Sequence, residues 1–211
     1  MPLEFAISAF VTLIVVVDPI GLVPTFLGVT QGMRPARRRQ VAMWAALIAC
    51  AILAGFAVGG EWLLRKLAIG LPAFRIAGGL LLFSIASEMV FGVRIVRQVN
   101  TAQKAVEEHA SNVAAFPLAI PLMAGPGAIT AVVLLSGRTN GDLLLLGMLF
   151  GVIALVGLFC LVAFISAARI GKLIGGAGNI VLSRLLGVLL AAMAVQFVLD
   201  GLRAVMQSAA G

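Results

Sequence analysis

The chain has 211 residues, of which 62% are hydrophobic and 11% are charged, and its mean hydropathy is +1.17. A water-soluble domain cannot bury so large an apolar share, so the composition excludes that class and indicates an integral membrane protein. The net charge of +7 comes from basic residues in connections between apolar segments, which is typical of membrane topology and argues against nucleic-acid binding.

Six apolar segments are long enough to cross a hydrocarbon core, which takes about 20 residues at ~1.5 Å each. They are residues 3–30, 40–60, 71–91, 110–137, 143–168 and 178–202. Residues 94–115 form the longest polar stretch, which we expect to be a connecting loop. The sequence therefore predicts a single all-α membrane domain, residues 1–211, with six transmembrane helices.

The two halves of the chain resemble each other. RIAGGLL at 75–81 aligns with RLLGVLL at 184–190, Pro19 with Pro126, and Cys50 with Cys160, at offsets of 109, 107 and 110 residues. These collinear matches indicate an internal repeat, with residues 1–93 and 116–211 as its two copies. Because each copy holds three spans, the second enters the membrane from the opposite side, which is the inverted-repeat architecture of many secondary transporters.

The basic residues suggest an orientation with both termini in the periplasm. That orientation places nine of the basic residues between the spans in the cytoplasm and four outside, as the positive-inside rule expects. Re-entrant hairpins in the first and fourth segments would give the same tally, so charge does not separate the two topologies. We favour full spans, because the 28 residues of 3–30 suffice for one interrupted crossing of ~30 Å and are tight for a hairpin.

The first and fourth segments carry helix breakers within apolar sequence. The first reads VVVDPIGLVPTFLGVT at 15–30, and the fourth contains Gly125-Pro126-Gly127. Asp-Pro is a helix-start signal, so we expect Asp18 to cap and begin a second half-helix near the bilayer midplane. Gly125-Pro126 begins another half-helix, with no side chain to cap its N–H groups.

Two such half-helix ends can bind a zwitterion. The ammonium group of a small amino acid would meet Asp18, and its carboxylate would meet the N–H groups after Gly125. An intramembrane aspartate is costly and is usually retained for transport or proton relay. The alternative is that Asp18 only caps its own helix and that the Gly-Pro breaks are packing kinks.

Candidate substrate-binding residues are those at the two breaks, their threonines and one polar residue of the last segment. They are Asp18, Pro19, Gly21, Pro24, Thr25, Pro121, Gly125, Pro126, Gly127, Thr130 and Gln196. Candidate pathway residues are Ser84, Glu88, Arg75 and Arg184, although the arginines can equally snorkel and the others can join helices.

Metal and enzyme chemistry find little support in the sequence. The chain has one histidine, His109, and its two cysteines lie within separate apolar segments, so we expect no metal site and two cysteines that act as small hydrophobes. No Ser/His pair or Cys redox motif is present, so we do not expect an enzyme.

The stretches DPIGLVPTFL, FRIAGGLLL, PLAIPLMAGPGAIT and LSRLLGVLLAAMAVQFVLDG occur in this order along the chain. In them the sequence resembles the MarC family of bacterial inner-membrane proteins, which is grouped with small neutral amino acid transporters. The resemblance covers nearly the whole chain and implies six spans and no cofactor. An Asn often follows the Asp-Pro-x-Gly core in that family, whereas this chain has Leu22, so its substrate is expected to differ if that Asn binds substrate.

We therefore expect an inner-membrane secondary transporter of small neutral amino acids or similar metabolites, with Asp18 as a candidate for proton coupling. An ion or small-solute channel is the alternative, because opposed half-helices can also form a selectivity constriction. The expected partners are a small-molecule substrate and the lipid bilayer, with a homo-oligomer as a further candidate.

Overall fold

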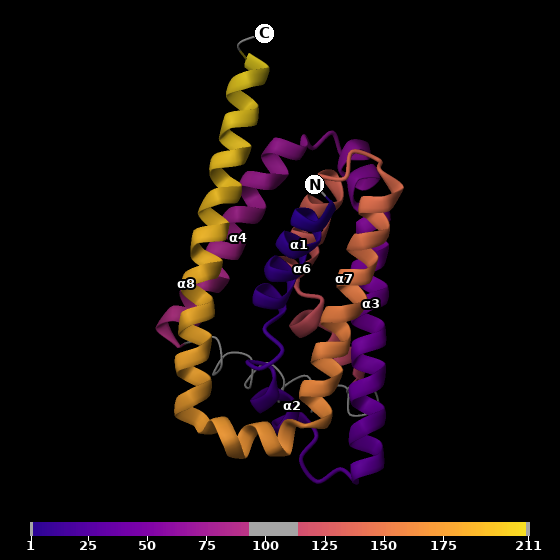
Figure 1. Ribbon diagram of the computed structural model, residues 1–211, viewed down its shortest axis with the longest axis vertical. Helices are drawn as coiled ribbons and strands as arrows, with labels where there is room; N and C mark the ends of the chain where they lie inside the picture. The colour runs from indigo at the N-terminus through magenta and orange to yellow at the C-terminus, as the bar shows by residue number, and fades with distance from the viewer. Residues whose placement is uncertain (1, 93–113, 210–211) are drawn as a thin grey trace.

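The computed structural model describes residues 2–92 and 114–209, and every regular element in these ranges is a helix. The elements, in chain order, are α1 (Pro2–Val17), α2 (Val23–Val29), α3 (Pro35–Lys66), α4 (Leu71–Phe91), the π-helix η1 (Ala114–Met123), α6 (Pro126–Gly137), α7 (Leu143–Ile165) and α8 (Ala167–Ala209) (Figure 1). Most of the expected loop at 94–115 lies outside the described residues, and residues 114 and 115 belong to η1 instead.

Four helical segments are long and apolar enough to cross a membrane. They are Pro35–Lys66, Leu71–Phe91, Leu143–Ile165 and the part of α8 from Gly178 to Gln207. They match four of the six predicted segments. The helices Pro2–Val17 and Pro126–Gly137 are apolar but shorter. Large apolar side chains such as Leu47, Leu158 and Leu189 are exposed on the long helices, as lipid-facing positions of a membrane protein are.

Prolines and turn residues set most of the helix ends. Arg34 is extended before Pro35, and Pro35 stands in the first turn of α3, where no N–H is needed. α4 ends at Gly92, which has a left-handed φ of 76° and donates its N–H to the carbonyls of Glu88 and Met89. Asp142 caps α7 by accepting a hydrogen bond from Leu144 N at 2.8 Å.

The helices pack as two outer pairs around a central pair. α4 packs along α8, α3 packs along α7, and α1 and α6 lie between these pairs (Figure 1). α1 begins and α8 ends at the same end of the bundle. The first part of α8 runs across the opposite end before the helix turns along α4.

Glycine brings α4 and α8 close together. A Cβ atom on Gly79 of α4 would lie 2.7 Å from the carbonyl oxygen of Ala194, and one on Gly187 of α8 would lie 2.8 Å from Met89 Cβ. Helices in lipid associate through such small residues, because there is no apolar driving force between them. The α4–α8 contact is therefore close packing of backbones.

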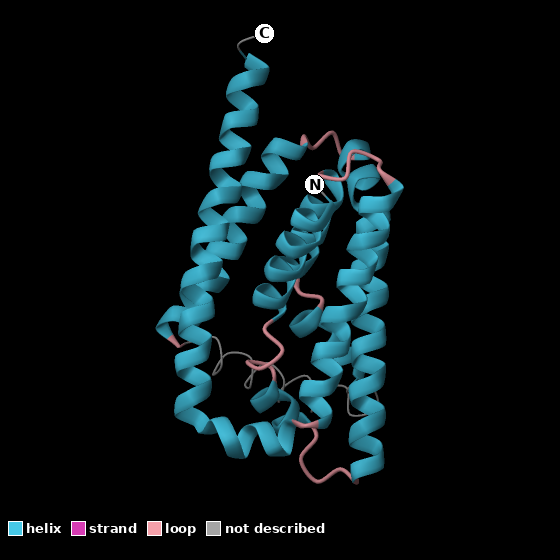
Figure 2. Ribbon diagram, in the orientation of Figure 1, coloured by secondary structure: helices cyan, strands magenta, loops and turns pink. Residues whose placement is uncertain are grey.

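Two loops interrupt the interior of the bundle. One follows α1, which ends at Val17, and the other precedes α6, which begins at Pro126. Both lie at about half the height of the bundle, as the pink loops of Figure 2 show. The segment before the second loop is a π-helix, in which Ala124 N donates to Ala119 O at 2.9 Å, a bond five residues back. Pro117 and Pro121 fall in it, and their missing N–H groups disfavour a regular α-helix.

Candidate functional site

The site is built around Asp18, at the end of α1. Its side chain is 3% exposed, and among the residues whose side chains are described it is the only buried Asp, Glu, Lys or Arg. One carboxylate oxygen, Oδ1, accepts a hydrogen bond from Gly21 N at 3.0 Å. The other, Oδ2, accepts one from Ser183 Oγ at 3.3 Å. A buried carboxylate is stabilised by such donors, so both contacts help to hold it in place.

The Asp18 side chain caps the turn of residues 18–21, and it does not cap the start of α2. Its φ is +53°, and its N–H donates to Ile14 O, which closes α1. The bond from Gly21 N has the spacing of an N-cap, and Leu22 N donates to Asp18 O. The regular helix nevertheless begins at Val23, so the expectation that Asp18 begins the second half-helix is corrected by one turn.

Gly21 is required by the position of the carboxylate. A Cβ atom at residue 21 would overlap Asp18 Oδ2 and would lie 2.6 Å from Asp18 Cγ. Glycine lets the chain fold back onto the Asp18 side chain. The Asp-Pro-x-Gly sequence therefore encodes this turn.

Ser183 connects the site to the second half of the chain. It is 4% exposed on α8, and Asn179, one turn earlier on the same helix, is 7% exposed. The sequence analysis did not select either residue. Their spacing of four residues within an apolar span is the signal that could have found them, because it places two polar side chains on one helix face.

The beginning of α6 lies close to the end of α1. A Cβ atom on Gly127 would lie 3.4 Å from Val16 Cγ1 and 2.7 Å from Ile85 Cδ1 of α4. Gly125 is the N-cap of α6 and offers no side-chain cap, as predicted. The first N–H of α6 with a partner is that of Ile129, which donates to Gly125 O at 3.0 Å. Within the described ranges, nothing accepts from Gly127 N or Ala128 N, so the positive end of α6 keeps free donors.

Two threonines lie within the helices that follow the loops. Thr25 is 1% exposed on α2, and its Oγ1 has no hydrogen-bond partner in the described part of the chain. Thr130 is buried on α6 and points its methyl group at Gly78 of α4. A buried hydroxyl without a partner costs free energy, so Thr25 Oγ1 is a group that a solute could satisfy.

Nearly the whole sequence matches the model of one known protein family. The model of the MarC family of integral membrane proteins matches residues 3–206. The chain belongs to this family.

Relatives from distant organisms align with this chain over nearly their whole length. A UPF0056 membrane protein of Methanocaldococcus jannaschii is 36% identical over 208 residues, covering 96% of this chain and 98% of the relative. UPF0056 membrane protein YvbG of Bacillus subtilis is 33% identical, with 96% of each chain covered. UPF0056 membrane protein YhcE of Escherichia coli is 32% identical, covering 93% of this chain and 91% of the relative. No solved structure matches this chain significantly.

The remaining predicted residues of this MarC-family chain have varied surroundings. Pro19 is buried, Pro24 is half-buried and Pro126 is exposed, while the Pro121 side chain lies outside the described residues.

Gln196 lies 13 residues beyond Ser183 on α8, about 20 Å along a helix, and donates to Asp200 at 2.7 Å. The structure therefore places Gln196 away from Asp18.

The four candidate pathway residues lie on α4 and α8. Ser84 is exposed, and Glu88 is half-buried near the end of α4. Arg184 is exposed, and its Nη2 lies 3.7 Å from the position of a Cβ at Gly92. Arg75 is half-buried near the start of α4.

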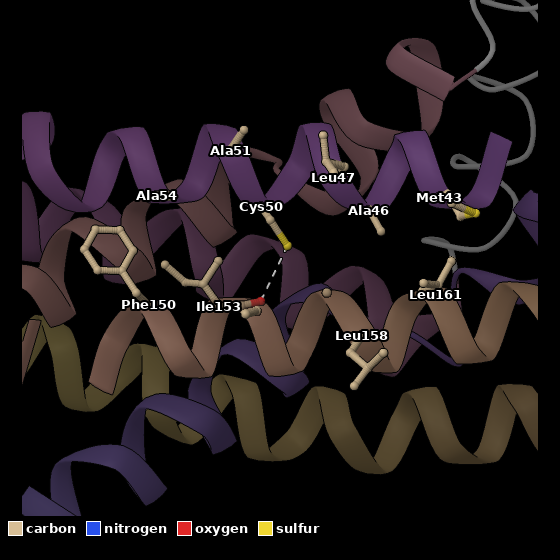
Figure 3. Close-up of a pocket in the computed structure, with 12 residues that line it drawn as sticks. Met43, Ala46, Leu47, Cys50, Ala51, Ala54, Phe150, Ile153, Leu158 and Leu161 are labelled. Carbon is tan, nitrogen blue, oxygen red and sulfur yellow. Dashed lines mark hydrogen bonds between the residues drawn. The ribbon is translucent and has the colours of Figure 1, made fainter. Parts of the chain in front are cut away.

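A pocket of about 570 Å³ lies elsewhere, between α3 and α7 (Figure 3). Its lining is apolar and includes Met43, Leu47, Phe150 and Leu161. Cys50 Sγ donates to Ile153 O at 3.6 Å in it. No group of three or more His, Cys, Asp or Glu side chains gathers among the described residues. The lining of the pocket does not include Asp18.

Proposed function

We propose that this protein is a secondary transporter of small neutral amino acids or similar small zwitterionic metabolites. The observation that carries the proposal is the buried Asp18 carboxylate, at an interruption of the helix next to the uncapped start of α6. The Asp18 carboxylate offers negative charge, and the start of α6 offers N–H donors. A zwitterion is the solute class that satisfies both.

The arrangement of the helices supports two inverted repeats of three spans. α1 with α2 and η1 with α6 would each form one broken span. α3 begins at Pro35 and α7 at Leu143, 108 residues later. The packing agrees with two equivalent halves. α3 of the first half packs on η1 and α6 of the second half, and α7 of the second half packs on α1 and α2 of the first half. Interrupted spans at a repeat interface form the binding sites of many secondary transporters.

The termini also support an even number of crossings. α1 begins and α8 ends at one end of the bundle, as six spans require (Figure 1). We assign this end to the periplasm of a bacterial inner membrane. Arg34, Arg37 and Arg39 are exposed at the start of α3, at the opposite end, as the positive-inside rule expects of the cytoplasmic side.

Asp18 is also our candidate for proton coupling. It is 3% exposed, so the described conformation holds the carboxylate closed off from water. Transport then requires opening of the helices around Asp18 toward one side at a time. An intramembrane carboxylate that is exposed to each side in turn is a typical part of a proton relay.

The test measures uptake of labelled glycine, alanine and serine into proteoliposomes, with and without a pH gradient. We expect saturable uptake by the wild type and about a tenfold or greater loss in Asp18→Asn and Gly125→Leu, because each change removes or covers one half of the binding centre. Asp142→Asn is the matched control, since Asp142 caps α7 in an exposed loop. Unsaturable, uncoupled flux would favour a channel, and wild-type uptake by both variants would contradict the proposed site.

A further inference from the structure

A second polar cluster lies at the end of the bundle where α1 begins. Three elements meet there: the start of α4, the end of α6 and α8 near residue 200. A Cβ atom on Gly137 would lie 3.0 Å from Leu71 Cδ2, and one on Gly201 would lie 2.9 Å from Pro72 O. Seventeen residues separate Ser183 from Asp200 on α8, so about 25 Å of helix divides this cluster from Asp18.

The one carboxylate of the cluster already has its partners. Asp200 Oδ2 lies 3.5 Å from Arg138 Nη2, and Asp200 Oδ1 accepts a hydrogen bond from Gln196 Nε2 at 2.7 Å. The Arg138 guanidinium also lies over the Phe197 ring, 5.5 Å from its centroid. These contacts hold Arg138 in a defined orientation.

Arg75 brings a second guanidinium to the cluster. Its Nε atom is buried and has no hydrogen-bond partner within the described residues. Burial lowers the pKa of Arg138, the positive charge of Arg75 lowers it further, and Asp200 opposes both effects. Arg75 lies one turn after Leu71, which packs against the end of α6 at Gly137, and Arg138 follows Gly137 directly, so the two guanidinium groups belong to adjoining helix ends.

We propose that Arg75 and Arg138 together bind a small oxyanion, a carboxylate or a phosphate group, at this end of the bundle. Guanidinium groups pair with both through parallel N–H donors. A bound oxyanion reduces the repulsion between the two cations. The Arg138 and Asp200 side chains are 35% and 25% exposed, so an anion can reach them. Dissolved anions and lipid headgroups share this chemistry.

The test follows thermal unfolding of the full chain in lipid-free dodecyl maltoside, through the fluorescence of Trp44 and Trp62. Inorganic phosphate and acetate are titrated against chloride at constant ionic strength. A ligand that binds the folded state raises the apparent Tm with its concentration. We expect this rise in the wild type and about a tenfold or greater loss of apparent affinity in R75Q, because a charged hydrogen bond is removed.

Two further variants make the result specific. R65Q is the matched control, since Arg65 is exposed on α3 and pairs with Glu61 one turn away, and it should respond like the wild type. D200N should bind the oxyanion more tightly, because it removes the competing carboxylate. The tighter binding by D200N also tests the site if R75Q does not fold. If Asp200 had only a structural role, D200N would lower the Tm without tightening oxyanion binding.

A separate arm identifies the source of the oxyanion. The same variants are compared in nanodiscs of phosphatidylcholine with and without phosphatidylglycerol. A Tm rise with phosphate or acetate alone assigns a dissolved anion, and a rise that needs phosphatidylglycerol assigns a lipid headgroup. A wild type that responds to none of these, an R75Q response equal to the wild type, or weaker binding by D200N would overturn the proposal. The assay involves no transport, so its outcome is independent of the proposed function.

Discussion

Ser183 donates a hydrogen bond to Asp18 across 165 residues of sequence. The carboxylate lies at the interruption of the first apolar segment, and the hydroxyl lies on the last helix, so one contact joins the two halves of the chain. Both side chains are buried, at 3% and 4% exposure. The contact therefore ties the buried carboxylate to the last helix of the bundle.

We predict that Ser183→Ala lowers both the apparent Tm and the uptake of small neutral amino acids. The variant leaves Asp18 Oδ2 without its donor, which costs about 1–3 kcal/mol for a buried group. Ser87→Ala is the control, because Ser87 Oγ donates only to Phe83 O within its own helix. In the double variant with Asp18→Asn, the losses should be smaller than their sum, as for residues in contact. Additive losses would indicate that the two side chains do not act together.

Gly21→Ala should disrupt the same turn from its other side. The new methyl group would occupy the space of the Asp18 carboxylate, so we expect a loss of about 1–3 kcal/mol in stability. Gly28→Ala, seven residues later, has open space around its Cβ position and should be neutral or stabilising by up to about 1 kcal/mol. Thermal unfolding of the two variants checks the difference. Equal Tm values would mean that the carboxylate does not fill the space beside Gly21.

Apolar length and turn residues predicted much of the fold. The segment 71–91 was predicted from its apolar length, and α4 has the same bounds, with Pro72 in its first turn and Gly92 as its C-cap. α3 runs past both ends of the predicted 40–60, since charged residues such as Arg38 and Arg65 continue a helix without being apolar. The π-helical form of η1 was not predicted, because hydropathy does not distinguish helix types.

The candidate site was predicted in part. The Asp-Pro pattern indicated Asp18 as the cap of a second half-helix, but hydrogen bonding within 18–22 delays the regular helix to Val23. Ser183 was missed because its role depends on a contact between distant segments, which one sequence does not reveal. Gln196 was assigned to the site from its depth in the last span alone. The structure pairs it with Asp200, four residues later on the same helix.

Gly79→Ala should weaken the contact between α4 and α8. Its Cβ position is 2.7 Å from the Ala194 carbonyl oxygen and 3.1 Å from Val198 N, and backbone atoms cannot move aside cheaply. We expect a loss of about 1–3 kcal/mol in the free energy of unfolding. Gly55→Ala on α3, with no atom near its Cβ position, should not lose stability. If Gly79→Ala is as stable as Gly55→Ala, the two helices are further apart than the structure shows.

A size exchange tests the packing between α3 and α7. Cys50 Sγ overlaps the place that a Cβ atom on Gly157 would take. Gly157→Ala should therefore cost about 1–3 kcal/mol through overpacking, and Cys50→Ala should leave a small void. In the double variant the new methyl group fills the space that sulfur vacates, so Gly157→Ala should cost less in the Cys50→Ala background than in the wild type. Gly151→Ala, also on α7 but with open space around it, should show no such dependence on residue 50. Thermal unfolding of the three single and two double variants measures the coupling, and its sign decides whether Cys50 and Gly157 pack as a complementary pair.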